Sequence, residues 1–410
     1  MVTFSKSTKQ AILLYATTIL GTVVGILASV INTRALSPIE YGDVKYVNNI
    51  IVFISGLLLL GYFTSGSRLL ALAKSKQDAK EIKGSMIVVV LITVFVLMLI
   101  MVLCAFIHKY LIQKDFYYLF LWVIPVCSGN ILFNYINTSS MGDNSISTIA
   151  LARLLPHTIY VILAFFIYAN ITVTSKTVLL LQNSVSVLVL VLLLCANGFS
   201  FINLKSRLHD LKLENKEYGF HVYLGSLFTI AVPYIAGISL GLFNVDNSLV
   251  GFYTLALSTT QPLAMVPNVI GTSFFKRFAL QDKIDRKVLI FTFLITLITL
   301  VAFVILIFPL VDLLYNDAYS VVAYYACYLG VGAIIHGLGD VFYRFLGAHG
   351  RGKEIRNVSI VTGIFSMIGY TLGIYLFGVT AAIVTRILVA VIYFVGMCHY
   401  YSKLTSLRHA

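Results

Sequence analysis

Long apolar stretches separated by short polar segments run along almost the whole chain of 410 residues. Because about 20 apolar residues are needed to cross the ~30 Å hydrocarbon core of a bilayer, this pattern predicts twelve transmembrane helices. The predicted spans are residues 11–31, 44–66, 86–107, 116–138, 148–169, 177–199, 221–243, 250–272, 288–310, 318–341, 357–377 and 379–400. One straight helix over the last two spans would be ~66 Å long, so we expect the chain to turn at Gly378. We expect no cleavable signal peptide ahead of the first span.

The two halves of the pattern match each other in the positions of their helix ends. Gly42 begins an apolar stretch that closes at Arg68, and Gly251 begins another that closes at Arg277, each residue 209 positions after its counterpart. Internal duplication is common in membrane transporters, whose substrate site lies between the repeats. Because each half has an even number of spans, both halves enter the membrane in the same direction, which predicts a parallel repeat.

The expected fold is an all-α integral membrane protein with two six-helix lobes. We place the N-terminal lobe at residues 1–200, a cytoplasmic linker at 201–220 and the C-terminal lobe at 221–410. The composition agrees with this class, because 59% hydrophobic residues, 11% charged residues and a mean hydropathy of +0.94 exclude a soluble globular domain.

The basic residues predict the orientation, because Lys and Arg are retained in cytoplasmic loops. With both termini in the cytoplasm, 22 of the 29 Lys and Arg residues fall in inner segments and five in outer segments. The net charge of +13 therefore follows from membrane insertion and gives no support to nucleic-acid binding. Contact with anionic lipid of the inner leaflet is a further expectation.

The cysteines and the loops exclude several kinds of chemistry. All five cysteines lie inside apolar spans without paired spacing, so we expect no disulfide framework, no metal site and no cofactor. The loops are short, which leaves no room for a soluble catalytic domain. We therefore expect that the protein is not an enzyme.

Polar residues inside the spans are the candidates for binding, because such groups are costly in lipid and usually face a cavity. Several share a helix face by their spacing, and the alternative for any one of them is a hydrogen bond between helices, at ~0.6 kcal/mol each. The uncharged candidates are Asn48, Asn49, Asn130, Asn134, Gln261 and His336.

Four basic residues complete the candidate set. Arg386 lies ~10 Å from the outer end of its predicted helix, where burial of a charge is costly unless it faces a cavity or a buried partner. Arg153 is shallower, and Arg34 and Lys45 lie at outer helix ends, where interface anchoring is the alternative. All sixteen acidic residues fall in loops or near helix ends. Cations and amides without deep acids favour an anionic, polar substrate.

Three segments carry a resemblance to a known family. Asn32–Asn49 reads NTRALSPIEYGDVKYVNN, an Arg at a helix end followed by a Leu-Ser-Pro-x-x-Tyr-Gly segment. Leu249–Ala279 reads LVGFYTLALSTTQPLAMVPNVIGTSFFKRFA, and Leu346–Asn357 reads LGAHGRGKEIRN. These segments resemble the first loop, the eighth helix and the turn after the tenth helix of the Wzx-type polysaccharide flippases. That family belongs to the multidrug/oligosaccharidyl-lipid/polysaccharide (MOP) exporter superfamily.

The resemblance implies a V-shaped, MATE-like pair of lobes in the bacterial cytoplasmic membrane. It implies alternating access that moves an undecaprenyl-diphosphate-linked oligosaccharide to the outer leaflet, for a surface polysaccharide such as O-antigen or capsule. The polysaccharide polymerase machinery would be a partner, and the cationic cavity would include Arg34, Lys45, Arg153 and Arg386. A multidrug or metabolite cation antiporter is the alternative. A polymerase or ligase would need a long outer loop with charged residues, which the chain lacks.

Overall fold

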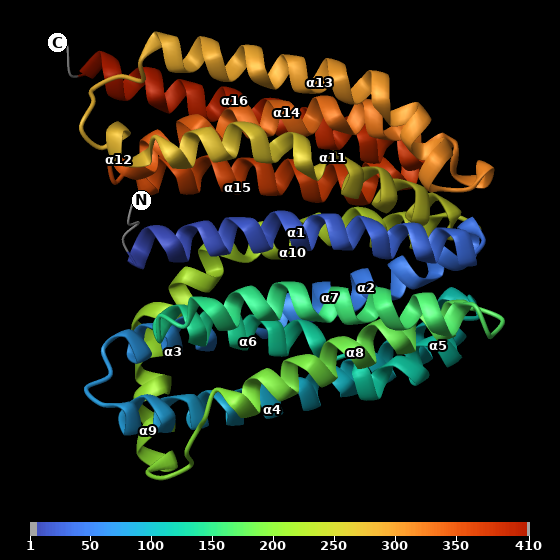
Figure 1. Ribbon diagram of the computed structural model, residues 1–410, viewed down its shortest axis with the longest axis horizontal. Coiled ribbons are helices and arrows are strands. Elements are labelled where there is room, and N and C mark those ends of the chain that lie inside the picture. Colours follow the sequence, from blue (N-terminus) through green and yellow to red (C-terminus); the bar gives the residue numbers. More distant parts are fainter. Residues whose placement is uncertain (1–5, 408–410) are drawn as a thin grey trace, which may run out of the picture. The chain divides into compact units, whose positions relative to one another are not determined.

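The computed structural model describes residues 6–407, which form helices and turns and contain no strand (Figure 1). The predicted cytoplasmic termini, 1–5 and 408–410, lie outside the described residues. The chain divides into two compact units. Unit 1 comprises residues 1–36 and 47–231, and unit 2 comprises residues 37–46 and 232–410. The division therefore falls inside two helices, α2 and α10.

Unit 1 is built mainly from the N-terminal half of the chain. Its elements are α1 (Lys6–Ala35), the inner part of α2 (Pro38–Leu58), α3 (Tyr62–Ala71), α4 (Lys76–Ile107), η1 (His108–Ile112), α5 (Tyr117–Val123), η2 (Ile124–Val126), α6 (Gly129–Gly142), α7 (Ile146–Tyr168), α8 (Ser175–Ala196), α9 (Leu204–Glu214), η3 (Asn215–Gly219) and the start of α10 (Phe220–Phe243). Within the unit α1 packs along α7, and α3 packs along α6.

Unit 2 holds the remaining elements. They are the first turns of α2, the end of α10, α11 (Ser248–Ser273), α12 (Phe275–Phe278), α13 (Arg286–Leu314), η4 (Asp317–Tyr319), α14 (Val321–Ala348), α15 (Gly352–Ile368), η5 (Gly369–Gly373) and α16 (Ile374–Leu407). Helix α14 is central, since it packs against both α11 and α16. Glycines allow this approach: a Cβ on Gly337 would lie 2.5 Å from Cγ of Pro267 in α11, and one on Gly339 would lie 2.7 Å from the Tyr393 ring in α16.

Long apolar helices account for most of the predicted spans. Among the described residues, nine helices are long and apolar enough to cross a membrane, or ten if the bent pair α2 and α3 forms one span. One of the nine, over Gly352–Ser406, includes both of the last predicted spans and departs from helical geometry at Gly378, with φ 60° and ψ −141°. The predicted turn at Gly378 is therefore confirmed. The number twelve stays a prediction.

The second predicted span, 44–66, is not one straight helix. Helices α2 and α3 meet at an angle of 59°, and Leu60 and Gly61 between them have left-handed φ values of 46° and 82°. The bend is held by η3, because Asn215 donates its side-chain N–H to the Leu60 carbonyl at 3.2 Å. A Cβ on Gly61 would lie 2.3 Å from the carbonyl oxygen of Gly219. The bend therefore depends on residues about 150 positions away, which helical periodicity does not reveal.

The two glycines that marked the internal repeat lie against each other in unit 2. A Cβ on Gly251 would lie 3.2 Å from the backbone N of Gly42, and one on Gly42 would lie 1.8 Å from the carbonyl oxygen of Asn247. Asn247 also donates its side-chain N–H to Asp43 at 3.0 Å. The two glycines of the predicted repeat thus lie at a close helix contact, and a side chain at position 42 would clash with the Asn247 backbone.

The residues between the predicted lobes form a structured part of unit 1. They contain α9 and η3, and the hydroxyl of Tyr223 at the start of α10 donates to the Leu57 carbonyl at 2.7 Å. The domain boundaries at 200 and 221 stay a prediction.

Candidate substrate-binding residues

Arg386 lies on α16 beside the glycine-rich face of α14. Its Cγ is 3.5 Å from where a Cβ on Gly332 would lie, which is van der Waals distance, so the arginine stem packs directly against α14. Its Nε is buried and has no hydrogen-bond partner among the described residues. The guanidinium interacts with Tyr370, which hydrogen-bonds Tyr253, and both tyrosines are buried. Arg386 therefore retains one buried donor, its Nε, inside unit 2.

A second polar group surrounds Asp340, which lies two helical turns after Gly332 on α14. Tyr393 of α16 donates its hydroxyl to Asp340 Oδ1 at 2.8 Å, and Asn268 of α11 donates its side-chain N–H to Asp340 Oδ2 at 3.1 Å. Arg344 donates to the Asn268 side-chain oxygen at 3.4 Å. Both oxygens of the Asp340 carboxylate are therefore occupied by donors from neighbouring helices. This acid ties α11, α14 and α16 together.

His336 connects these two groups. Its ring stacks on Tyr393 with ring centroids 4.3 Å apart and an interplanar angle of 23°. It also lies within electrostatic range of both Asp340 and Arg386. The structure therefore brings His336 and Arg386, two of the predicted candidates, into one polar cluster inside unit 2.

The other two candidates of unit 2 lie elsewhere. Lys45, in the first turns of α2, places its Nζ 5.0 Å from the ring centre of Tyr41. Gln261 is exposed on α11.

In unit 1, Arg153 makes direct contacts with two neighbouring helices. It donates to the Thr18 hydroxyl of α1 at 3.0 Å and to the Asn137 side-chain oxygen of α6 at 3.3 Å. Its guanidinium is therefore at least partly engaged in holding α1, α6 and α7 together. Arg34 is exposed in the last turn of α1.

The asparagine candidates of unit 1 are engaged in different ways. Asn134 donates its side-chain N–H to the backbone oxygen of Asn130 at 2.9 Å, so this side chain bonds within its own helix, α6. Asn48 accepts a hydrogen bond of 3.2 Å from Asn183 of α8. Asn49 is partly exposed beside it on α2. Whether the candidates of the two units share one cavity stays a prediction.

Sequence reasoning missed five residues that complete these groups. Tyr253, Tyr370 and Tyr393 resemble ordinary core aromatics in an apolar stretch. Asn183 lies in a short polar segment with Gln182 and Ser184, which was a usable signal. Asn268 had a usable signal, because it follows Gln261 by seven positions and so lies on the same side of α11. Within residues 6–407, no group of three or more His, Cys, Asp or Glu side chains is arranged to hold a metal ion.

Comparisons with known proteins identify the family. A family model described as "Polysaccharide biosynthesis protein" matches residues 7–279, about two thirds of the chain. No curated protein matches the chain at a significant level.

Several solved structures share the fold. An inward-facing multidrug resistance MATE family transporter of the MOP superfamily is 16% identical, with 97% of this chain and 99% of that chain covered and a TM-score of 0.69. Lipid II flippase MurJ in an inward closed conformation is 14% identical, with 96% and 90% covered and a TM-score of 0.70. The eukaryotic MATE transporter AtDTX14 is 15% identical, with 97% and 98% covered and a TM-score of 0.59.

These likenesses confirm the predicted all-α, MATE-like fold class. The matched family model, which covers about two thirds of the chain, shows that the chain belongs to the polysaccharide biosynthesis protein family.

Proposed function

We propose that this protein flips an undecaprenyl-diphosphate-linked oligosaccharide from the inner to the outer leaflet of a bacterial cytoplasmic membrane, by alternating access. The observation that carries the proposal is the family match over residues 7–279 in a chain with the fold of a lipid II flippase. The flipped repeat unit would supply a surface polysaccharide such as O-antigen or capsule. The protein would move its substrate without chemical change and would deliver it to the polymerase machinery.

The polar cluster of unit 2 supports an anionic cargo. Arg386 has a buried donor without a partner among the described residues, and guanidinium groups bind phosphate oxygens through charge-assisted, often bidentate hydrogen bonds. The acid of the same cluster, Asp340, already accepts hydrogen bonds on both oxygens. A cation exporter of the same superfamily, the second candidate function, would use a buried acid to bind its cargo. The contacts of Asp340 therefore favour the flippase over the antiporter.

Loss of the protein is expected to change the leaflet in which the substrate accumulates. Cells lacking it should lose the surface polysaccharide and accumulate the lipid-linked single repeat unit on the cytoplasmic side. Access of an impermeant glycan-cleaving or glycan-binding reagent, added to spheroplasts before and after lysis, would measure the leaflet. A lipid-linked unit accessible from outside would point to a polymerase defect. Unchanged surface glycan with raised sensitivity to cationic drugs would support the antiporter instead.

The orientation with cytoplasmic termini can be tested by labelling single cysteines in a version without native cysteines. Two exposed residues are suitable: Gln77 at the start of α4, and Thr172 between α7 and α8. Gln77 lies on the predicted cytoplasmic side and Thr172 on the predicted outer side. Gln77→Cys should react with an impermeant maleimide only after the membrane is opened. Thr172→Cys should react in intact spheroplasts. The reverse pattern would overturn the orientation that the positive-inside rule predicts.

A further inference from the structure

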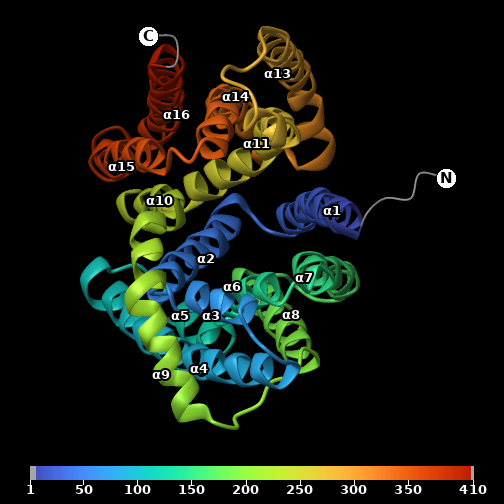
Figure 2. The ribbon, with the colours of Figure 1, turned by 90° about the vertical axis from the view of Figure 1, so that its left-hand side faces the viewer.

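Helix α9 lies across the direction of the neighbouring helices of unit 1. Figure 1 shows α9 crossing the end of α4, and Figure 2, turned by 90° from that view, shows α9 along its length. Leu211 is almost completely buried, which fixes one side of α9 against the unit. A helix placed across the ends of membrane spans lies close to the plane of the lipid headgroups.

Three acidic residues on or beside α9 form ion pairs with arginines inside unit 1. Arg207 forms ion pairs with Asp78 at 2.6 Å and with Glu81 at 3.1 Å, both at the start of α4. Glu214 pairs with Arg68 of α3 at 2.5 Å. These pairs neutralise the carboxylates on the inner side of α9 and fix α9 to α3 and α4.

The opposite side of α9 is cationic. Lys205, His209, Lys212 and Lys216 recur at i, i+4, i+7 and i+11, about half a turn away from Arg207 and Glu214, and all four are exposed. None of the three lysines forms an ion pair within the described residues. Exposed apolar side chains flank this face: Phe201 (49%), Ile202 (61%) and Leu213 (47%). Cationic and apolar side chains together are typical of a helix that binds the surface of an anionic membrane.

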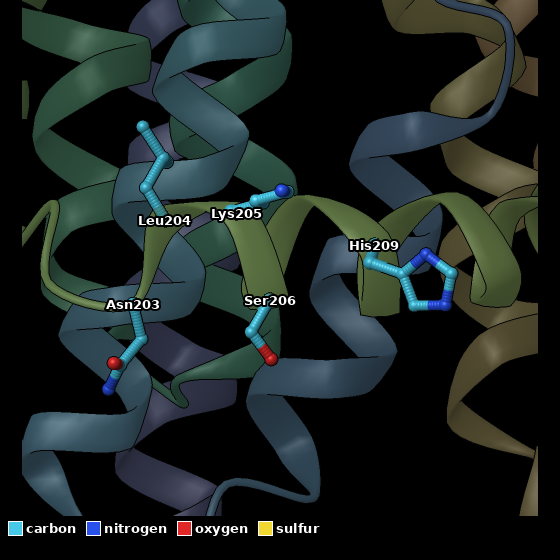
Figure 3. A pocket seen from close by; sticks show the side chains of 5 residues that line it. All are labelled: Asn203, Leu204, Lys205, Ser206 and His209. Carbon is cyan, nitrogen blue, oxygen red and sulfur yellow. The ribbon is translucent and has the colours of Figure 1, made fainter.

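A hollow at the first turns of α9 adds hydrogen-bond donors to this face. It is lined by Asn203, Leu204, Lys205, Ser206 and His209 (Figure 3). The Asn203 side chain is engaged by Glu81, at 3.4 Å to each carboxylate oxygen. The ammonium of Lys205 and the ring of His209 are the groups that could contact a phosphate.

We propose that this cationic face, formed by Lys205, His209, Lys212 and Lys216 with the hollow beside it, docks onto the headgroups of anionic phospholipids. Positive-inside topology alone requires basic residues in this segment, but it does not require Asp78, Glu81 and Glu214 to be paired on the other side of α9. That separation of charge produces a surface complementary to the negatively charged inner leaflet. Glu217, in η3, is the exposed acid beside the cationic face. Docking would hold the inner end of unit 1 at the membrane surface. The inference relies on the cytoplasmic orientation, and it is independent of the transported substrate.

The test measures the distance of α9 from lipid headgroups in the intact protein. A version without native cysteines, carrying Ser206→Cys labelled with a fluorophore, is reconstituted into vesicles of phosphatidylcholine alone or mixed with phosphatidylglycerol. A lipid with a nitroxide on its headgroup serves as the quencher. We expect stronger quenching with phosphatidylglycerol, weakened by high salt because exposed charges are screened. Replacing Lys205, Lys212 and Lys216 together by Gln should reduce that quenching by about half or more.

The matched control removes the same charge from another exposed segment on the predicted inner side. Lys283, Arg286 and Lys287, before and at the start of α13, are replaced together by Gln and should leave the quenching unchanged. Equal quenching in both lipid mixtures, or equal loss in both triple variants, would overturn the proposal. So would quenching that depends on the α9 lysines only in native membranes, since that result would indicate a protein partner. Size-exclusion profiles would confirm that the variants are folded.

Discussion

Arg386→Ala is expected to reduce transport by about tenfold or more while the protein remains in the membrane at its normal level. A hydrogen bond to a charged group contributes about 1.5–3 kcal/mol, and each 1.4 kcal/mol is about a factor of ten. The Nε of Arg386 has no partner among the described residues, so it is the donor available to an anionic group, and the variant also removes the contact with Tyr370. The measurement is the surface polysaccharide restored to cells lacking the gene, divided by the amount of protein in their membranes.

Two further variants are compared with Arg386→Ala: Arg386→Lys, a conservative replacement, and Arg356→Ala, a control. Lysine keeps the charge but loses the planar, bidentate geometry of the guanidinium, so partial transport is expected. Arg356 is exposed near the start of α15, and its replacement by Ala should leave transport close to the normal level. Full transport by Arg386→Ala at equal expression would mean that Arg386 only supports the packing of Tyr253 and Tyr370.

The contacts of Asp340 explain why depth in a helix is an incomplete guide to a binding site. Asp340 and His336 lie one turn apart on α14, and the sequence indicates a common face for them. The structure shows that Asp340 is occupied by Tyr393 and Asn268, whereas His336 lies between that group and Arg386. Which polar side chain is satisfied depends on what the neighbouring helix presents. A single sequence does not contain that information.

The fold was more predictable than the site for a similar reason. Membrane helices follow from hydrophobic length alone, because the bilayer sets the same requirement for each span. The turn at Gly378 follows from helix length, and the structure has it there. The bend at Leu60 and Gly61 was not predicted, since it is held by a hydrogen bond from Asn215. Likewise, Asn48 was a candidate from its own helix, but its partner Asn183 lies 135 positions away.

Gly42→Ala is expected to destabilise unit 2, because the added methyl group would meet the backbone. A Cβ at Gly42 would lie 1.8 Å from the carbonyl oxygen of Asn247 and 2.4 Å from its carbonyl carbon. Asn247 cannot move freely, since its carbonyl accepts the Gly251 N–H at 3.1 Å and its side chain donates to Asp43 at 3.0 Å. Overpacking of this kind costs on the order of 1–3 kcal/mol, and a rigid backbone neighbour favours the upper end.

The expected results are a lower apparent Tm of the detergent-purified protein and a lower level in the membrane. Gly352→Ala is the matched control, because Gly352 begins α15 and a Cβ there would meet nothing within 4 Å. Alanine also favours the helix over glycine, so the control should be as stable as the unmodified protein or more so. If Gly42→Ala were equally stable, the close contact of the two repeat glycines would not be needed for folding, and the shared position of Gly42 and Gly251 would require another explanation.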